Sequence, residues 1–230
     1  MKQASGNVLF LILIAVALFA ALSYAVTQSS RSGSGGIERD KAKLYAAQFV
    51  QYGTAIEQAI GRMRVINRTP EYGIDLASSV TWSSSANATC TTNVCKVFHV
   101  EGGGISPAFI DEKAFDTSLG IAPTIFRHSV FRAVSVVDVG SDLDELVLII
   151  AGLKKEVCAE INKSMGIIDG GNPPTDVYTG YGDYRGTLTA FPEATAVQGD
   201  GSALFEGKRT FCAYYNAATG YTFYHVLMER

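Results

Sequence analysis

The sequence has few charged residues and no run of lysines and arginines. Only 18% of its 230 residues are Asp, Glu, Lys or Arg, and its formal net charge is −3. Nucleic-acid binding needs a basic face that neutralises phosphates, and polybasic docking on anionic lipid depends on the same chemistry. The composition therefore argues against nucleic acid as a partner and gives no polybasic segment for lipid docking.

Sequence motifs of common enzyme classes are also missing. There is no G-x-S-x-G elbow, no H-E-x-x-H, no P-loop and no Rossmann glycine motif after a candidate strand. The three histidines, His99, His128 and His225, stand alone in candidate strands or loops. We therefore expect no catalytic residue, no cofactor and no enzymatic activity.

A long apolar run is present near the start of the chain. Residues 8–26 contain no charged side chain, and as a helix they would span about 28 Å, close to the roughly 30 Å hydrocarbon core of a bilayer. The sequence predicts a transmembrane-type helix over residues 7–28, inserted in a membrane or packed in a filament core. The side chains that we expect to make assembly contacts are Leu9, Leu11, Ile14, Leu18 and Leu22.

The sequence leaves the processing of this helix open. Ser23 and Ala25 place small residues where a signal peptidase reads, so cleavage after Ala25 would release the rest of the chain. A chain that keeps Met1 would instead hold the helix as a simple membrane anchor. The apolar run alone does not decide between these fates.

A third fate comes from a family resemblance. Residues 2–6 (KQASG), followed at once by the apolar run, resemble the short basic leader of the type IV pilin superfamily. The resemblance implies a leader over residues 1–6 and cleavage between Gly6 and Asn7, with the helix kept on the mature protein. The chain departs from the family at Asn7, where Phe or Met is usual, and at Leu11, where most pilins carry Glu. These departures weaken the resemblance to a major pilin more than the resemblance to pilin-like proteins in general, and they leave open whether the subunit is major or minor.

The remainder of the chain is predicted to be a Ser/Gly linker followed by one globular domain. Residues 29–36 (SSRSGSGG) have the composition of a flexible break. Apolar residues then recur at steps of three and four over residues 37–67, which predicts an amphipathic helix ending before Pro70. Candidate strands follow at residues 96–100 and 129–139, a strand or the start of a helix at 146–151, a helix at 153–165, and a hairpin formed by 209–215 and 221–228. The predicted fold class is α+β over residues 37–230, with the second helix packed on an antiparallel sheet, a layout similar to pilin domains.

The four cysteines indicate disulfides and an oxidising compartment. Cys90, Cys95, Cys158 and Cys212 allow three pairings. We favour Cys90 with Cys95, which closes a tight loop, and Cys158 with Cys212, which ties the late helix to the hairpin. A zinc site is the alternative, but it would require all four thiolates to converge from an isolated C-x4-C and two single cysteines.

Two further groups of residues are candidate binding sites. Tyr178, Tyr181 and Tyr184 alternate with glycines and could form a contact surface for a neighbouring subunit or a glycan, or pack in the fold. An acidic turn offers weak calcium candidates or a solvated loop, and the resemblance supports calcium because several pseudopilins bind this ion in a late loop. The candidates in this turn are Asp138, Asp142 and Asp144, with Glu145 beside them.

The sequence thus predicts a structural subunit of a type IV pilus-like or pseudopilus-like filament that assembles through its N-terminal apolar helix. Its partners would be further copies or related pilin-like subunits, and the membrane. Its location would be the inner membrane before assembly, and then the periplasm or a cell-surface or extracellular filament. The alternative is a single-pass membrane-anchored or secreted binding module outside the cytoplasm.

Overall fold

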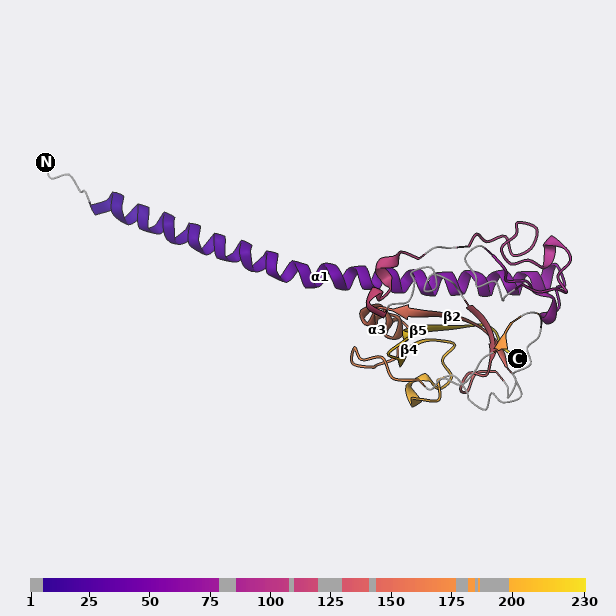
Figure 1. The fold of residues 1–230 in the computed structure, drawn as a ribbon. Helices are drawn as coiled ribbons and strands as arrows, with labels where there is room; N and C mark the ends of the chain where they lie inside the picture. Colours follow the sequence, from indigo (N-terminus) through magenta and orange to yellow (C-terminus); the bar gives the residue numbers. More distant parts are fainter. Residues whose placement is uncertain are drawn as a thin grey trace. The chain divides into compact units, whose positions relative to one another are not determined.

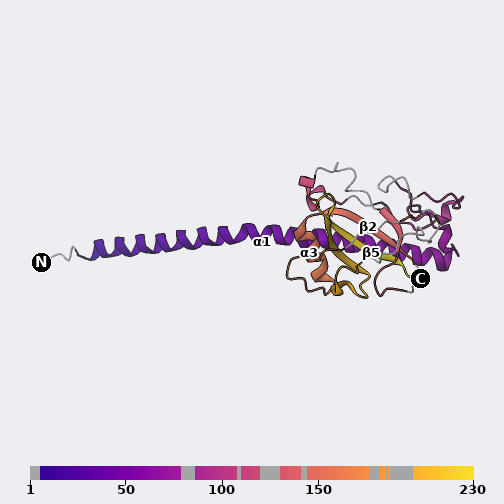
Figure 2. The same cartoon turned by 60° about the horizontal axis from the view of Figure 1, so that its bottom comes forward.

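The chain is α+β in a computed structural model that describes residues 6–78, 86–107, 110–119, 130–140, 144–176, 182–184, 186 and 199–230. It divides into two compact units, Met1–Lys41 and Ala42–Arg230. Figures 1 and 2 show the helices and strands. The longer elements are α1 (Gly6–Ile66), β1 (Val130–Val134), β2 (Glu145–Leu153), α3 (Lys155–Ser164), β3 (Gly182–Asp183), β4 (Thr210–Asn216) and β5 (Gly220–Met228). Short 3₁₀ helices are η1 (Glu71–Gly73), η3 (Asn93–Cys95), η4 (Glu112–Ala114), η5 (Thr117–Leu119) and η6 (Ala203–Phe205).

The part of α1 that belongs to the larger unit is amphipathic, as its spacing predicts. The side chains buried on one face recur at steps of three and four residues. They are Ala42, Ala46, Phe49, Tyr52, Ile56, Ala59, Ile60 and Met63. Burying a large apolar side chain contributes about 1.5–3 kcal/mol relative to exposure, so this face supplies much of the stability of the domain. The helix ends at Ile66, and the backbone N–H groups of Asn67 and Thr69 both donate to the carbonyl of Met63.

The prediction that the chain breaks at residues 29–36 is wrong, because the backbone of these residues is helical and belongs to α1. Each of the three glycines in this segment disfavours a helix by about 1 kcal/mol relative to alanine. Extending a helix is much easier than starting one, so good helix formers on both sides can carry the helix through the serines and glycines of this segment.

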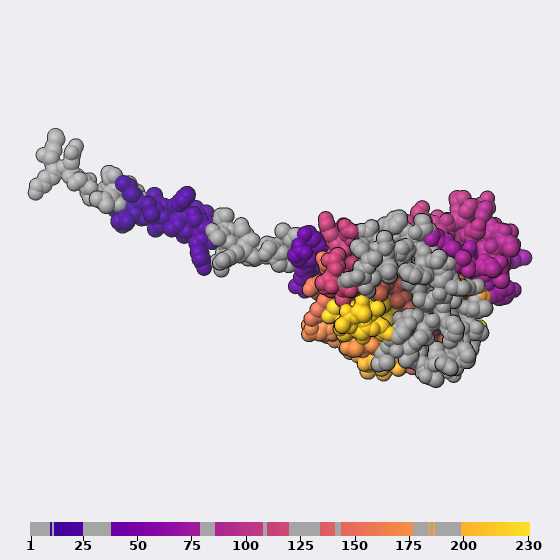
Figure 3. All heavy atoms as spheres, in the orientation of Figure 1, coloured from indigo at the N-terminus to yellow at the C-terminus, as the bar shows by residue number. Residues whose placement is uncertain are grey.

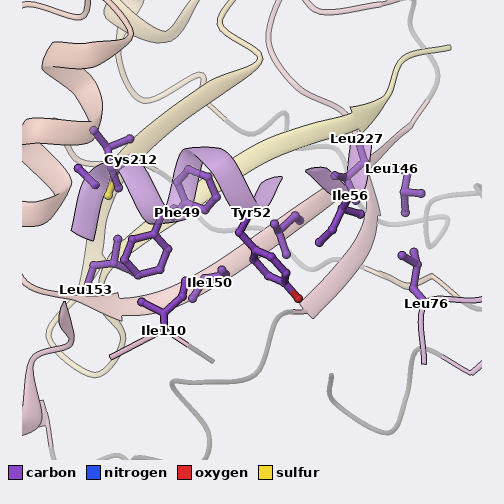
Figure 4. Close-up of a cluster of buried hydrophobic side chains, with 14 of the residues drawn as sticks. Phe49, Tyr52, Ile56, Leu76, Ile110, Leu146, Ile150, Leu153, Cys212 and Leu227 are labelled. Atoms are coloured by element: carbon purple, nitrogen blue, oxygen red, sulfur yellow. The ribbon is translucent and has the colours of Figure 1, made fainter. Parts of the chain in front are cut away.

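The sheet is antiparallel and has the strand order β3-β1-β2-β5-β4. Helix α1 covers one of its faces. Figure 4 shows Phe49, Tyr52 and Ile56 of α1 among Leu146 and Ile150 of β2. The ring of Phe49 lies 5.7 Å from that of Phe223 in β5 and 5.7 Å from that of Phe115. The main core therefore lies between α1 and the two central strands.

A second, smaller core covers the opposite face of the sheet. Val147 and Ile149 alternate with the α1-facing residues of β2 and point into this second cluster. Phe205 of η6, Phe211 of β4 and Tyr224 of β5 stack there, with ring centroids 4.6 and 4.8 Å apart. Because β2 is buried on both faces, its sequence is a continuous apolar run rather than an alternating one.

The structure confirms most of the predicted elements of the domain. Residues 146–151 belong to a strand, β2, and not to the start of a helix. The predicted hairpin is β4 and β5. The helix predicted over residues 153–165 is α3. It ends at a left-handed Gly166 (φ 72°), where the N–H groups of Gly166 and Ile167 return to the carbonyls of Lys163 and Asn162.

The strand predicted at residues 96–100 is wrong. Lys96 forms only an isolated bridge with Asp75, after which the chain turns back and the N–H of Gly103 donates to the carbonyl of Lys96. Val97 is fully buried, so its apolar character reflects packing in the main core rather than membership of a sheet. Of the strand predicted over 129–139, residues 130–134 form β1.

Candidate functional site

The first half of α1 presents large apolar side chains to solvent. Their exposed fractions lie between 41% and 75%. They are Phe10, Ile12, Leu13, Ile14, Val16, Leu18, Phe19, Leu22 and Tyr24. Such a continuous apolar surface marks a site of contact with other apolar groups. Within the described residues, no helical stretch meets the length and apolarity required to cross a bilayer.

Three of the five predicted assembly residues belong to this exposed surface. Ile14, Leu18 and Leu22 recur at steps of four, so they lie along one side of the helix. The side chains of Leu9 and Leu11 lie outside the described part of the chain. So do residues 1–5 of the predicted leader, and α1 begins at Gly6.

The larger unit also offers apolar surface beside α1. Leu44 is exposed on the helix, and a groove of about 490 Å³ lies between α1 and α3. Ala46, Ala47 and Val50 from α1 and Met165 from the end of α3 form its apolar lining. Its polar lining consists of Lys43, Gln51, Glu160, Lys163 and Ser164. The surface beside α1 therefore combines apolar side chains with charged ones.

Both predicted disulfides are present. Cys90 and Cys95 form the loop disulfide, with Cα atoms 5.8 Å apart, and Cys158 and Cys212 form the α3–β4 disulfide, with Cα atoms 5.3 Å apart. No cysteine is left to bind zinc. The disulfides support the predicted oxidising compartment without identifying it.

A buried amide reinforces the α3–β4 disulfide. The side chain of Asn162 accepts from the backbone N–H of Cys212 and donates to its carbonyl, both at 2.8 Å. Its Nδ2 also donates to Asp169 at 2.9 Å. Asn162 is fully buried, so these bonds satisfy an amide that would otherwise be costly inside the core. The sequence gives no signal for this role, because the partner lies 50 residues away.

The predicted tyrosine contact surface is wrong at Tyr184. This residue is fully buried in the main core, and its hydroxyl donates to the backbone carbonyl of Glu71. Burial raises the pKa of this phenol above its ordinary value, so the hydroxyl stays protonated. Tyr178 and Tyr181 lie outside the described residues.

The hairpin tyrosines pair across the strands. Tyr214 faces Tyr221 in the register of β4 and β5, and their rings meet edge to face with centroids 5.2 Å apart. Tyr224 is buried in the second core. These side chains stabilise the sheet rather than forming an open contact surface.

Two of the three calcium candidates in the acidic turn belong to the described residues. No group of three or more Asp, Glu, His or Cys side chains in that part of the chain could hold a metal ion. Asp138 is exposed with a left-handed backbone (φ 52°), Asp144 is half-buried, and Asp142 lies outside the described residues. The calcium interpretation stays a prediction, since one of its three candidates is not described.

Glu145, beside this turn, has an unusual environment. It is fully buried at the start of β2, and its Oε2 accepts from the N–H of Val136 at 2.9 Å. Its Oε1 has no hydrogen-bond partner in the described structure. Burial raises the pKa of this carboxyl to about 7; Asp144 and Glu229 raise it further, and hydrogen bonds from the backbone N–H groups of Val136 and Glu145 oppose them. At neutral pH the group is therefore poised between its two protonation states.

A buried histidine network joins α1 to the hairpin. Nδ1 of His225 lies 2.7 Å from Oγ1 of Thr210, and Nε2 lies 3.1 Å from a carboxylate oxygen of Glu57. The other oxygen of Glu57 accepts from Arg209 at 2.8 Å. Burial lowers the pKa of His225 below its ordinary value, although Glu57 acts in the opposite direction. The neutral ring that accepts from Thr210 and donates to Glu57 satisfies every group in the network.

The order Thr–His–Glu resembles a nucleophile, its base and an orienting acid, but the packing does not favour catalysis. Thr210 and His225 are both buried. A Cβ placed on Gly53 of α1 would lie 2.7 Å from Cγ of His225, so the helix backbone closes one side of the ring. Phe223 stacks beside the ring. The network fastens α1 to the sheet. His99 is half-buried and its Nδ1 accepts from the N–H of Glu101, while His128 lies outside the described residues.

Comparison of the chain with known proteins identifies no relative. No family model, no curated protein and no solved structure matches this chain.

Proposed function

We propose that the chain is a structural subunit of a type IV pilus-like or pseudopilus-like extracellular filament. Subunits assemble by packing the first halves of their α1 helices together, and the α+β domain forms the outer part of each subunit. Before assembly the helix holds the subunit in the inner membrane. The proposal includes cleavage between Gly6 and Asn7, which would leave α1 as the start of the mature protein.

The observation that carries this proposal is the uninterrupted apolar surface of α1 between Phe10 and Tyr24. Nine large apolar side chains there are 41–75% exposed in the single chain. At about 25 cal/mol per Å² of apolar area removed from water, burying such a surface against neighbouring subunits is strongly favourable. The absence of a charged side chain over residues 8–26 lets identical helices approach without repulsion.

The layout of the domain supports the same proposal. The second half of α1 buries one face against an antiparallel sheet and leaves Leu44 exposed. One helix thus carries both the apolar segment and a face that belongs to the core of the domain. Because Leu11 takes the place of the usual acid, contacts between subunits depend on apolar packing rather than on a buried carboxylate paired with an amine.

A matched pair of variants tests assembly. Leu18→Glu places a carboxylate in the apolar surface, whereas Ile168→Glu makes a similar change at an apolar residue that is 87% exposed in the domain. We expect Leu18→Glu to abolish filaments seen by electron microscopy of surface material and Ile168→Glu to leave them intact. Circular dichroism and the absence of free thiols would show that the α+β domain is folded in each of the two variants. Filaments of normal length with Leu18→Glu would refute the proposal.

Intact mass separates this function from a membrane-anchored or secreted binding module. A mature chain that starts at Asn7 supports the filament subunit. A start at Val26 contradicts it, because the apolar segment would then be lost. A retained Met1 favours the simple anchor. Antibody labelling of filaments for the domain provides the complementary measurement in the native cell.

A further inference from the structure

Apolar side chains gather at the C-terminal end of α1 and in the loops beside it. This end patch consists of five residues, with exposed fractions of 79%, 70%, 63%, 42% and 84% for Val65, Ile66, Tyr72, Val94 and Val100 respectively. Figure 3 shows the end of α1 and the loops that follow it collected at one end of the domain. An exposed apolar group of this size at one place indicates a contact surface.

The loops that carry the patch are held firmly. Nδ2 of Asn67 donates to the carbonyl of Val94 at 3.0 Å and also lies 3.4 Å from that of Glu101. Arg62 donates to the carbonyl of Gly103. A Cβ on Gly103 would lie 2.2 Å from the carbonyl oxygen of Val97, so this turn packs too closely for any other residue. Together with the loop disulfide, these contacts keep the apolar side chains exposed in one arrangement, which reduces the entropy lost on binding.

Basic side chains surround the patch, although the chain as a whole is acidic. Arg62 and Arg68 are exposed at the end of α1, and Lys96 lies in the neighbouring loop. Glu71 forms ion pairs with Arg64, at 2.8 Å, and with Arg230, at 3.4 Å. Glu101 is the exposed acid beside Val100. The balance around the patch is therefore positive, and it attracts an anionic partner.

A groove beside Val65 gives room for a polar group. It measures about 660 Å³ and is lined by Arg64, Thr69, Glu71 and Tyr72, among others. Gly61 also lines it, and a Cβ at this position would meet nothing within 4 Å. Glycine is disfavoured inside a helix, and packing within the chain does not require it here. Because Gly61 has no side chain, the groove stays wide beside Arg64.

We propose that the end patch docks on a bilayer that contains anionic phospholipid. Val65, Ile66 and Val100 reach the boundary between the headgroups and the acyl chains, and Tyr72 lies among the headgroups. The surrounding arginines bind lipid phosphates. The patch residues protrude from α1, η1, η3 and the turn after η3, and are up to 84% exposed. A fluid bilayer can accept such protruding side chains, whereas a protein partner would need a matching set of hollows. This docking goes beyond filament assembly, since it uses the other end of α1.

Vesicle sedimentation with the full chain tests the proposal. The chain is kept in non-ionic amphipol, which covers the first half of α1, and is mixed with vesicles of phosphatidylcholine alone or with 30% phosphatidylglycerol. We expect at least tenfold tighter binding to the anionic vesicles, and a loss of tenfold or more in the double variant Val65→Glu, Val100→Glu. Ile168→Glu, the control with an acid at another exposed apolar site, should bind as the unaltered chain does.

A third variant and a second measurement separate the alternatives. Arg68→Gln should weaken binding to anionic vesicles several-fold and reduce its dependence on salt, while binding to phosphatidylcholine stays the same. Equal binding by the double variant and the unaltered chain would overturn the proposal, because the binding would then not depend on the end patch. Equal binding to both vesicle types would also overturn it. If sedimentation velocity shows that the double variant instead loses self-association, the patch is an interface between copies and the lipid proposal is wrong.

Discussion

Replacing Glu145 with glutamine should stabilise the domain above neutral pH. The carboxyl is fully buried and has a pKa of about 7 in the folded chain, compared with an ordinary value of 4.5. Between these pH values the folded state binds more protons at this group than the unfolded state does. Its contribution to stability therefore falls as pH rises from 4.5 to 7, and the loss is complete above pH 7.

The size of the effect follows from the same two values. One pKa unit corresponds to 1.36 kcal/mol, so the cost of ionising Glu145 in the fold approaches about 3 kcal/mol at pH 8. Glutamine has the same shape, remains neutral and can still accept the N–H of Val136. The free energy of unfolding of Glu145→Gln should therefore exceed that of the unaltered chain by about 2–3 kcal/mol at pH 8 and match it near pH 4.5.

Urea unfolding followed by far-ultraviolet circular dichroism at several pH values between 4.5 and 8 would measure this difference. Glu112→Gln is the control, because it removes one negative charge at an exposed site. The variant must be compared with the unaltered chain at each pH, because His225 also makes stability depend on pH. The pKa of His225 is lowered in the fold, so its contribution to stability decreases as the pH falls below 6.5. A difference that does not change with pH would refute the reasoning.

Three further predictions concern the contacts that fasten the domain. Replacing both cysteines of the α3–β4 disulfide with serine should lower the free energy of unfolding by about 4 kcal/mol, and the same change to the loop disulfide by about 2 kcal/mol, because the bridged residues are 54 and 5 positions apart; equal losses in urea unfolding would contradict this. His225→Asn should cost about 1–3 kcal/mol because it breaks two buried hydrogen bonds, whereas His99→Asn should cost under about 0.5 kcal/mol. Gly53→Ala should lower the melting temperature, because the added Cβ would collide with the ring of His225. Gly61→Ala should change the melting temperature less, because its Cβ would meet nothing.

The elements that could be predicted from the sequence are those specified by local patterns. The buried face of α1 recurs at the helical period, and Gly166 ends α3 because it can adopt a left-handed backbone. The hairpin is bounded by residues whose turn chemistry is local, with the side chain of Asn216 accepting from the N–H groups of Ala218 and Thr219. Each of these signals lies within a few residues of the structure that it determines.

What could not be predicted depends on residues that are far apart in the chain. Glu57 and His225 are 168 positions apart, and neither has a neighbour in sequence that indicates the pairing. Tyr184 alternates with glycine as a surface loop would, yet its hydroxyl reaches Glu71, 113 residues earlier. Glu145 looks like one more acid of a solvated turn until β2 and Val136 enclose it. Only the folded arrangement separates these buried polar groups from exposed ones.

The position of β5 has a consequence for the order in which the domain can form. This strand lies inside the sheet, between β2 and β4, and carries Phe223 against Phe49 of α1, but it is synthesised after all the other strands. If the chain crosses the membrane with its amino end first, Cys90 and Cys95 can form their disulfide before Cys158 has reached the oxidising side. Cys158 then meets no early thiol with which to mispair, and waits for Cys212. Vectorial emergence thus favours the native disulfides, while the apolar face of α1 needs protection until the last strand arrives.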